Sequence, residues 1–320
     1  MTIARNRDEH GKVPLGRLLA IDWGSSKLRG ALLDESGALV AERSCERGML
    51  HVAPPEFEAA LEAEFGDWLD LPGTRCLMAG MVGARQGWVE APYVPCPAGI
   101  DDFARRLQRV KPSASGKVRD IAIVPGATCD HDGVPDVMRG EEIKLIGAME
   151  LLGIGTATML SPGTHSKWAT VREGRLTGFS TMMSGEFYEV LRRHSILARS
   201  LPDDDGAMDG AAFDHGVERA LTGSSLLQTA FSVRCLDLFD RLPRAALPSY
   251  LSGLVIGEAL RWPPLDGVRS VVVIGTSVLT ERFARALALR GIDTQVLGDE
   301  AAWRGLWAID QRRATCAKES

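Results

Sequence analysis

The chain has 320 residues and a mass of 34.6 kDa, a length that accommodates two domains of roughly 150 residues each. Hydrophobic residues make up 45% and charged residues 25% of the sequence, which is typical of a globular protein and excludes a largely disordered chain. The 37 basic and 42 acidic residues leave a net charge of −5. This balance provides no basic surface for a nucleic acid or an anionic membrane, so we expect neither as a partner.

Membrane insertion and export are not expected either. No stretch approaches 18 uninterrupted apolar residues, and the polar N-terminus lacks the apolar region of a signal peptide. We expect residues 1–16 to form a flexible tail. The cysteines show neither CxxC pairs nor zinc-finger spacing, so we expect them to be reduced and without metal, in a cytoplasmic protein. They are Cys45, Cys76, Cys96, Cys129, Cys235 and Cys316.

In the first half of the chain, tight-turn residues separate three short apolar runs. This pattern predicts three strands that form an antiparallel meander. A helix with one apolar face follows after Pro54-Pro55. Alternating strands and helices complete this half. The predicted strands cover residues 18–21, 28–33, 38–44, 76–79 and 121–124, and the predicted helices cover residues 56–69 and 101–110.

The second half also opens with antiparallel strands around a polar turn, followed by helices and strands. This recurring order of elements predicts a duplicated α/β domain. We place the division after residue 125, with domains at 17–125 and 126–320. Strands are predicted at 158–160, 167–171, 176–181, 271–274 and 294–297. Helices are predicted at 139–152, 186–197, 225–242, 249–262 and 278–290.

The first candidate site is a turn that follows a buried strand. The strand delivers the carboxylate of Asp22 to its end, and a glycine then permits a tight turn with exposed hydroxyl and N–H groups. Such a turn can bind phosphate oxygens while the carboxylate holds Mg²⁺. An ordinary hairpin turn remains the alternative. The turn residues are Gly24, Ser25, Ser26 and Lys27.

Two later turns repeat this arrangement. After the strand at 158–160, the candidate phosphate-binding residues are Gly163, Thr164, His165, Ser166 and Lys167. His165 is a candidate ligand or acid, or simply a hydrogen-bonded loop residue. After the strand at 271–274, Gly275 and Thr276 precede a helix, whose N-terminus can approach a nucleotide closely. An ordinary strand-to-helix turn of an α/β protein is the alternative.

The order of the three turns resembles the sugar kinase, Hsp70 and actin superfamily. This resemblance implies an α/β fold of two ribonuclease H-like domains with an ATP cleft between them. Competing nucleotide motifs do not fit. The sequence has no GxxxxGK[ST] motif, and Gly153-Ile154-Gly155 follows a predicted helix rather than a strand, unlike a dinucleotide-binding turn.

Four segments narrow the resemblance to the 2-dehydro-3-deoxygalactonokinase family, over about residues 18–306. They are residues 81–93, 136–142, 162–168 and 184–186. The resemblance implies ATP- and Mg²⁺-dependent phosphorylation of 2-dehydro-3-deoxy-D-galactonate to its 6-phosphate, in D-galactonate breakdown. A kinase for another sugar or sugar acid, and a nucleotide-switch protein without enzymatic activity, stay open as alternatives. A homodimer also stays open.

The superfamily resemblance also places a catalytic base after a glycine at the start of a helix. The matching residue is Glu141, after Gly140, with Asp136 and Glu142 as rivals. Acidic residues in the first turn also stabilise a helix, which is the alternative explanation for both glutamates.

A sugar acid carries a carboxylate, which calls for an Arg or Lys side chain. Arg85 lies in a glycine-flanked loop with Gln86 and Trp88, and Arg139 is the second candidate. Alternatively, Arg85 anchors its own loop and Trp88 fills the core.

Overall fold

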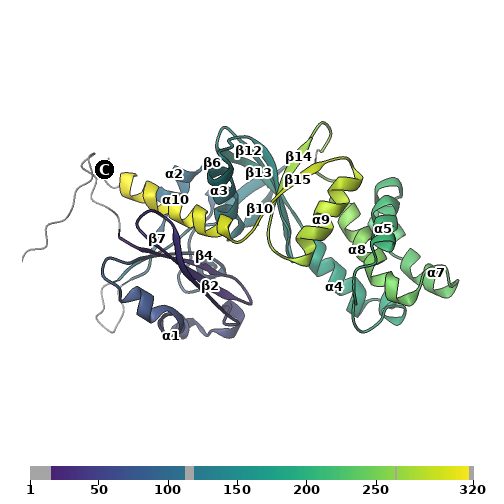
Figure 1. Cartoon of the computed structure of the whole chain (residues 1–320), viewed down its shortest axis with the longest axis horizontal. Coiled ribbons are helices and arrows are strands. Elements are labelled where there is room, and N and C mark those ends of the chain that lie inside the picture. The colour runs from purple at the N-terminus through teal and green to yellow at the C-terminus, as the bar shows by residue number, and fades with distance from the viewer. Residues whose placement is uncertain (1–15, 112–118, 264, 317–320) are drawn as a thin grey trace, which may run out of the picture. The chain divides into compact units, whose positions relative to one another are not determined.

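The computed structural model describes residues 16–111, 119–263 and 265–316 (Figure 1). The predicted N-terminal tail, apart from Gly16, and most of the predicted loop at 111–116 lie outside the described residues. The described residues form two compact units. The first contains the residues up to 155, residues 172–177 and the residues from 299, and the second contains residues 156–171 and 178–298.

The first unit is built on a sheet with the strand order β3-β2-β1-β4-β8-β7. Strand β1 pairs antiparallel with β2 and parallel with β4, which in turn pairs parallel with β8. Strand β2 also pairs antiparallel with β3, so the predicted three-strand meander is confirmed. The strands are β1 (Leu18–Trp23), β2 (Leu28–Leu33), β3 (Leu39–Cys45), β4 (Arg75–Gly80), β7 (Gln108–Arg109) and β8 (Asp120–Ile123).

Alternation along β1 separates the core from the candidate site. Ile21 and Trp23 belong to a core cluster that includes residues of helix α1 (Phe57–Leu69). The predicted apolar face of this helix, with Phe57 and Phe65, is buried in that cluster. Because successive side chains of a strand point to opposite faces, Asp22 points away from α1.

A three-stranded sheet with the order β10-β9-β5 also belongs to the first unit. Its hairpin was not predicted, although Asp132-Gly133 is a strong hairpin-turn signal, and both residues have a positive φ. The elements here are β5 (Val94–Pro95), β6 (Ala98–Gly99), β9 (Ala127–His131), β10 (Val134–Met138), α2 (Ile100–Arg105), α3 (Glu141–Leu152) and α10 (Glu300–Cys316), and the 3₁₀ turns Met49–His51, Pro54–Glu56 and Met81–Gly83.

The helix predicted at 101–110 is shorter than expected. It ends at Arg105, and Gln108 pairs with Ile123 as part of β7 at the edge of the sheet. The helix begins at Ile100, one residue earlier than predicted, and its N-cap is Gly99, whose N–H donates to the carboxylate of Asp102. Pairing with an exposed strand edge therefore overrides the helical pattern of residues 106–110.

The second unit repeats the sheet of the first. Its order is β15-β14-β11-β12-β13, in which β11 pairs antiparallel with β12 and parallel with β14, and β14 pairs parallel with β15. Strand β6 pairs with the start of β13 at Arg175–Leu176, residues that themselves belong to the first unit. The predicted duplication is confirmed by this common order. The strands are β11 (Ala157–Ser161), β12 (Ser166–Arg172), β13 (Arg175–Met182), β14 (Ser270–Ile274) and β15 (Asp293–Leu297).

Between β13 and β14 the second unit carries a group of helices. The helix predicted at 225–242 is two short helices, and a further helix, α5, was not predicted. The helices of this unit are α4 (Ser184–His194), α5 (Gly210–Thr222), α6 (Leu226–Thr229), α7 (Ser232–Leu238), α8 (Leu247–Ala259) and α9 (Val278–Leu289), with 3₁₀ turns at Ile196–Arg199 and Arg244–Ala246.

Glycines bring two helix pairs into close contact. In the first unit α3 lies against α10, where a Cβ on Gly147 would lie 1.7 Å from the carbonyl oxygen of Ala301 (Figure 1). In the second unit α5 lies against α8, where a Cβ on Gly216 would lie 2.2 Å from the carbonyl oxygen of Tyr250. No other residue fits either position without moving the helices apart.

The compact units do not follow the predicted division after residue 125, because α3 and α10 both pack in the first unit. The division into residues 17–125 and 126–320 stays a prediction about the two ribonuclease H-like halves.

We predict that Gly147→Ala lowers the free energy of unfolding by about 2 kcal/mol or more, because overpacking at the helix contact outweighs the better helix propensity of alanine. Gly66 in α1 is the matched control, since a Cβ there meets nothing closer than 4.0 Å. Gly66→Ala should stabilise the protein by roughly 0.5–1 kcal/mol. Urea unfolding of both variants measures the difference, and equal effects would contradict the tight contact.

Candidate functional site

The candidate site of the first unit lies at the carboxyl ends of β1 and β4. These neighbouring parallel strands place Asp22 beside Gly80. Gly80 and Gly140, which precedes α3, both have a positive φ and approach each other closely. A Cβ would lie 3.3 Å from Asp22 Oδ1 if placed on Gly80, and 4.0 Å from it if placed on Gly140. A Cβ on Gly80 would also lie 2.6 Å from the carbonyl oxygen of Trp23, and one on Gly140 would lie 3.2 Å from Cα of Gly80, so the close approach of the backbone beside Asp22 favours glycine at both positions.

Cationic groups surround the other oxygen of this carboxylate. The Nη2 of Arg29 lies 2.5 Å and the Nζ of Lys144 lies 3.9 Å from Asp22 Oδ2. The Nη1 of Arg29 lies 2.5 Å from Oδ1 of Asp299, just before α10. Sequence reasoning missed Lys144 and Asp299. Lys144 lies one helical turn after Gly140, which is a usable signal, whereas no local pattern links Asp299 to the site.

The backbone of the predicted first phosphate turn is held by hydrogen bonds from a segment that follows β3. The carbonyl oxygens of Gly24, Ser25 and Ser26 accept hydrogen bonds from the backbone of residues 48–50. The side chains of Ser25 and Ser26 are exposed, and exposed Lys27 pairs with Glu46 at 3.2 Å. The turn has the fixed backbone and exposed hydroxyls that phosphate binding requires.

The three candidate bases have different surroundings. Glu141 begins α3, is half-buried and accepts a hydrogen bond from the backbone N–H of Arg139. Glu142 is 1% exposed and accepts from the N–H of Gly140, while its Oε1 is buried without a partner. Asp136 lies on β10, with Oδ2 3.9 Å from Nε2 of His131. Burial places Glu142 out of reach of a substrate hydroxyl.

The loop after β4 holds the predicted substrate residues. The side chain of Arg85 is 84% exposed, and its Nε lies 3.8 Å from Oε1 of Glu90. Gln86 is also exposed. Trp88 stacks on Phe57 at 6.5 Å between ring centroids, against the core.

Arg139 supports the same loop. Its Nη2 donates to the carbonyl oxygen of Ala91, and its guanidinium lies 4.3 Å from the ring centroid of Tyr93. The Nε and Nη1 atoms are buried without a partner. The guanidinium of Arg85 is therefore the more accessible of the two candidates for a substrate carboxylate.

In the second unit the predicted turn meets the N-terminus of α4. Ser166 Oγ lies 2.7 Å from Ser184 Oγ, and the N–H of Glu186 donates to the carbonyl oxygen of Thr164. A Cβ on Gly185 would lie 2.7 Å from the carbonyl oxygen of Gly163. Two segments that are separate in the sequence, 162–168 and 184–186, therefore form one local structure.

Two further residues of this turn have partners of their own. His165 Nε2 lies 2.5 Å from Glu186 Oε2, and the buried Lys167 donates through Nζ to Thr181 Oγ1 at 2.7 Å.

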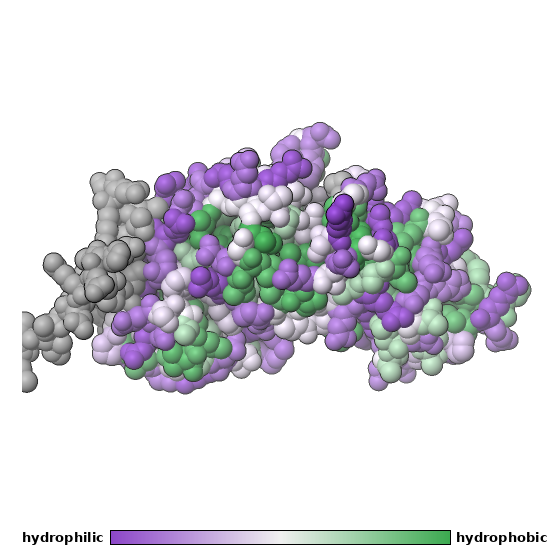
Figure 2. Space-filling view, turned by 45° about the horizontal axis from the view of Figure 1, so that its top comes forward, coloured by the Kyte–Doolittle hydropathy of each residue, from purple (hydrophilic) through white to green (hydrophobic). Residues whose placement is uncertain are grey.

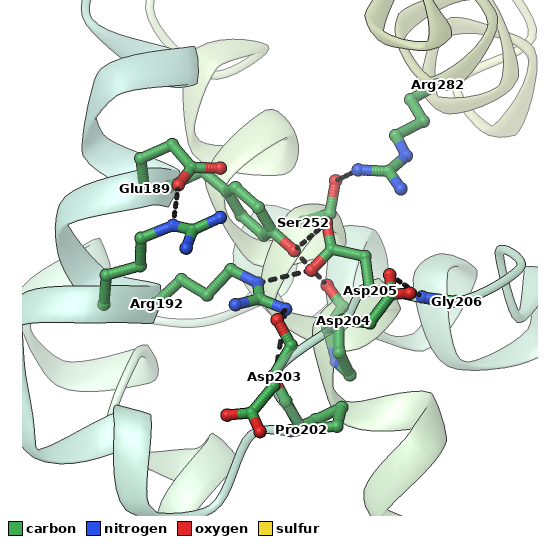
Figure 3. Close-up of polar contacts among 12 residues, drawn as sticks. Glu189, Arg192, Pro202, Asp203, Asp204, Asp205, Gly206, Ser252 and Arg282 are labelled. Atoms are coloured by element: carbon green, nitrogen blue, oxygen red, sulfur yellow. Dashed lines mark hydrogen bonds and ion pairs between the residues drawn. The ribbon is translucent and has the colours of Figure 1, made fainter.

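A cavity of about 590 Å³ opens beside this turn. Its walls come from the turn and from α4, α8 and α9, with Val278 and Leu279 directly after the predicted third turn. The polar side of the cavity is shown in Figure 3, where Arg192 pairs with Asp205 and Arg282 donates to Ser252. Helix termini, apolar walls and a few fixed polar groups suit a nucleoside with an attached phosphate chain.

The residues around Asp22 fit a magnesium ion. Among the residues that the structure describes, no group of three or more His, Cys, Asp or Glu side chains could hold a metal. Mg²⁺ commonly uses one or two carboxylates together with substrate phosphates and water. Oδ1 of Asp22, which lies beside two glycines, suits that mode.

None of the described helices is long and apolar enough to cross a membrane. Figure 2 shows apolar residues gathered in several areas of the drawn face, with hydrophilic residues between them.

The two sheets of common order, each with a polar turn after its first strand, define the fold of the actin, Hsp70 and sugar-kinase class. A solved structure from Acidaminococcus fermentans, (R)-2-hydroxyglutaryl-CoA dehydratase component A, shares this fold. It has a TM-score of 0.51 and 14% identity, over 93% of this chain and 99% of that one.

Residues 22–309 match the family model described as 2-keto-3-deoxy-galactonokinase, and the chain belongs to this family of carbohydrate kinases. A 2-dehydro-3-deoxygalactonokinase from Escherichia coli is 36% identical over 92% of this chain and 97% of its own length. A probable 2-dehydro-3-deoxygalactonokinase from Rhizobium meliloti is 35% identical over 92% of this chain and 96% of its length. A solved structure from Sinorhizobium meliloti, described under the same enzyme name, has a TM-score of 0.83 and 34% identity, covering 92% of this chain and 98% of that one.

The buried carboxyl of Glu142 should make stability depend on pH. Burial, and then the negative charge of Glu141, raise its pKa to about 8. Between about pH 4.5 and 8 the folded state therefore binds a proton that the unfolded state lacks, so the free energy of unfolding falls as pH rises.

We predict that Glu142→Gln removes the fall in the free energy of unfolding between about pH 4.5 and 8. The variant should gain roughly 1 kcal/mol over the natural protein for each pH unit in that window, because a neutral amide needs no proton. Urea unfolding from pH 5 to 8 measures the difference. Glu150→Gln, at the exposed end of the same helix, should leave the pH dependence unchanged. A constant difference between Glu142→Gln and the natural protein would contradict a raised pKa.

Proposed function

We propose that this chain transfers the γ-phosphoryl group of ATP to 2-dehydro-3-deoxy-D-galactonate and forms the 6-phosphate. The observation that carries the proposal is the arrangement at Asp22 in a chain of this family. A buried strand ends in a carboxylate that has one oxygen bound by cations and the other beside two glycines.

For ATP, we propose that the turn at 24–27 contacts phosphate oxygens and that the cavity of the second unit takes the nucleoside. The turn at 163–167 and the residues Gly275 and Thr276 are proposed as further nucleotide contacts. Asp22 would hold Mg²⁺, which would neutralise charge on the transferred phosphate when bound. Lys144 lies beside Asp22 and limits the negative charge that this carboxylate presents to the phosphates.

For the proton of the attacking hydroxyl, we propose Glu141 as the acceptor. It stands at the N-terminus of α3 directly after Gly140, and it is less buried than Glu142. Asp136 remains the rival base. Phosphoryl transfer depends chiefly on positioning and charge neutralisation, so the contribution of this base is expected to be moderate.

For the sugar acid, we propose that Arg85 binds the carboxylate and that Gln86 contributes a hydrogen bond. Arg139 holds the loop that carries both, through Ala91 and Tyr93. Trp88 would contribute by fixing the loop against the core rather than by contacting the sugar. We also propose a cytoplasmic location for this chain.

A substrate panel tests the activity directly. ADP release is measured with 2-keto-3-deoxy acids of galactonate and gluconate configuration, with plain aldoses and without an acceptor. We expect the galactonate compound to give the highest kcat/KM. A preference for a neutral aldose would assign another sugar kinase, and ATP hydrolysis that ignores every acceptor would assign a nucleotide switch.

We predict that Asp22→Asn lowers kcat by roughly 10³-fold or more, because the neutral amide cannot hold Mg²⁺ against the phosphates. Binding of a non-hydrolysable ATP analogue, measured by calorimetry, should also lose its dependence on Mg²⁺. Asp34→Asn is the control, since Asp34 follows β2 and only caps a surface turn through Ser36 and Ala38. Turnover close to normal in folded Asp22→Asn would remove the metal role.

We predict that Arg85→Ala raises KM for the acid by about ten-fold to several hundred-fold and leaves KM for ATP nearly unchanged, because the substrate loses a charge-assisted hydrogen bond. The amide of the substrate should show a much smaller increase. Arg106→Ala removes another exposed arginine of the first unit and serves as the control. An equal penalty on acid and amide would show that Arg85 shapes the loop instead of binding the charge.

A further inference from the structure

A cluster of cysteine, histidine and aspartate side chains lies on the small sheet β10-β9-β5, and the proposed phosphoryl transfer does not use the cysteines or the histidine. Cys129 and His131 are two residues apart on the central strand β9, so they share one face. The Sγ of Cys129 lies 3.5 Å from Nε2 of His131. On the neighbouring strand Asp136 is the direct partner of Cys129, and its Oδ2 lies 3.9 Å from the same imidazole nitrogen.

A second cysteine lies on the other side of Cys129. Strands β5 and β9 are parallel, with Pro95 opposite Thr128. The next N–H, that of Cys96, donates to the carbonyl oxygen of Thr128 at 2.8 Å, which continues the ladder and places Cys96 opposite Cys129. Neighbouring strands are about 4.8 Å apart, and a disulfide needs Cα atoms roughly 4.4–6.8 Å apart. The backbone therefore meets the distance requirement for a disulfide.

The two thiols have different surroundings. Burial, and then the negative charge of an ionised Cys129, raise the pKa of Cys96 to about 12, so Cys96 stays protonated. Cys129 is half-buried and has an imidazole within reach of its proton, and the side chain of His131 is 48% exposed. A partly exposed thiol beside a histidine has the surroundings of a reactive cysteine.

We propose that Cys129 is a peroxide-reactive thiol and that Cys96 closes a disulfide with it across strands β5 and β9. The oxidant is hydrogen peroxide or another hydroperoxide. In the cytosol, disulfides that form under such conditions are transient and serve as sensors. The two thiols and the imidazole have no role in the proposed transfer reaction; Asp136 of the same cluster is the rival base there, and the thiol chemistry does not use it.

The chemistry balances in two steps. The Cys129 thiol gives its proton to His131 Nε2, and the thiolate sulfur attacks one oxygen of the peroxide. The O–O bond breaks and an S–O bond forms, so the sulfur is oxidised by two electrons to a sulfenic acid, and the other oxygen leaves as water after it takes a proton. The sulfur of Cys96 then attacks the sulfur of Cys129. The S–O bond breaks, and the hydroxyl leaves as water with the proton of Cys96.

The first experiment treats the intact protein with hydrogen peroxide and maps the tryptic peptides by mass spectrometry. Trypsin releases residues 86–105, with Cys96, and residues 120–139, with Cys129, as separate peptides. We expect one linked species that is two hydrogens lighter than the two peptides together and that dithiothreitol separates. Cys45 and Cys235 are also half-buried and serve as internal controls. We expect each of them to react with peroxide at about one tenth of the rate of Cys129 or more slowly.

Three variants assign the roles, and an unchanged Tm shows that each one folds. Cys96→Ser should stop at the sulfenic acid, which dimedone traps on residues 120–139. Cys129→Ser should leave Cys96 unoxidised under the same conditions. His131→Gln should slow dimedone labelling of Cys129 in the Cys96→Ser background by about ten-fold.

Several results would overturn the proposal. They are the absence of the linked peptide in the natural protein, dimedone labelling of Cys45 or Cys235 at the rate of Cys129, and oxidation of Cys96 in Cys129→Ser. An unchanged labelling rate in the His131 variant would remove the histidine from the proposal. All of these readouts are masses, so they stay independent of whether the kinase activity is the one proposed.

Discussion

The close packing of three backbone segments around one carboxylate is the constraint on which the site depends. Strands β1 and β4 must be parallel neighbours to place Asp22 beside Gly80, and α3 must begin close enough for Gly140 to approach that glycine. A side chain at either glycine would fill the space beside Oδ1. In the same unit α3 also lies close to α10, which Gly147 permits.

Charge around Asp22 is balanced by residues that arrive from distant parts of the chain. Arg29 comes from the next strand, Lys144 from α3, and Asp299 binds the other side of the guanidinium. Glu142 contributes differently, because burial raises its pKa to about 8 and favours its neutral form. The site thus combines Asp22, which is held by cations, with Glu142, whose carboxyl group burial keeps close to neutral.

The β9–β10 hairpin connects two kinds of chemistry in the first unit. Its last strand leads through Met138 to Arg139 and Gly140, where the phosphoryl-transfer residues begin. Its first strand carries the thiol and imidazole for which we propose peroxide chemistry. Residues that alternate along strands collect on one face, so a short sheet of three strands can hold a reactive cluster beside a binding loop.

The sequence by itself determined the positions of most strands along the chain, the three polar turns and the family. These features depend on local hydrophobic periodicity, turn residues and short motifs. It also predicted the buried face of α1 and the strand-end position of Asp22. The tertiary structure alone decided that Glu142 is buried, that Asp299 binds Arg29, and that Cys96 lies opposite Cys129. The two pairings join residues that are far apart in the chain, and the burial of Glu142 depends on which face of its helix is covered. Local patterns carry no information about either, because long-range packing overrides local propensity. The shortened α2 shows the same effect, since pairing with an open strand edge replaced a predicted helical turn.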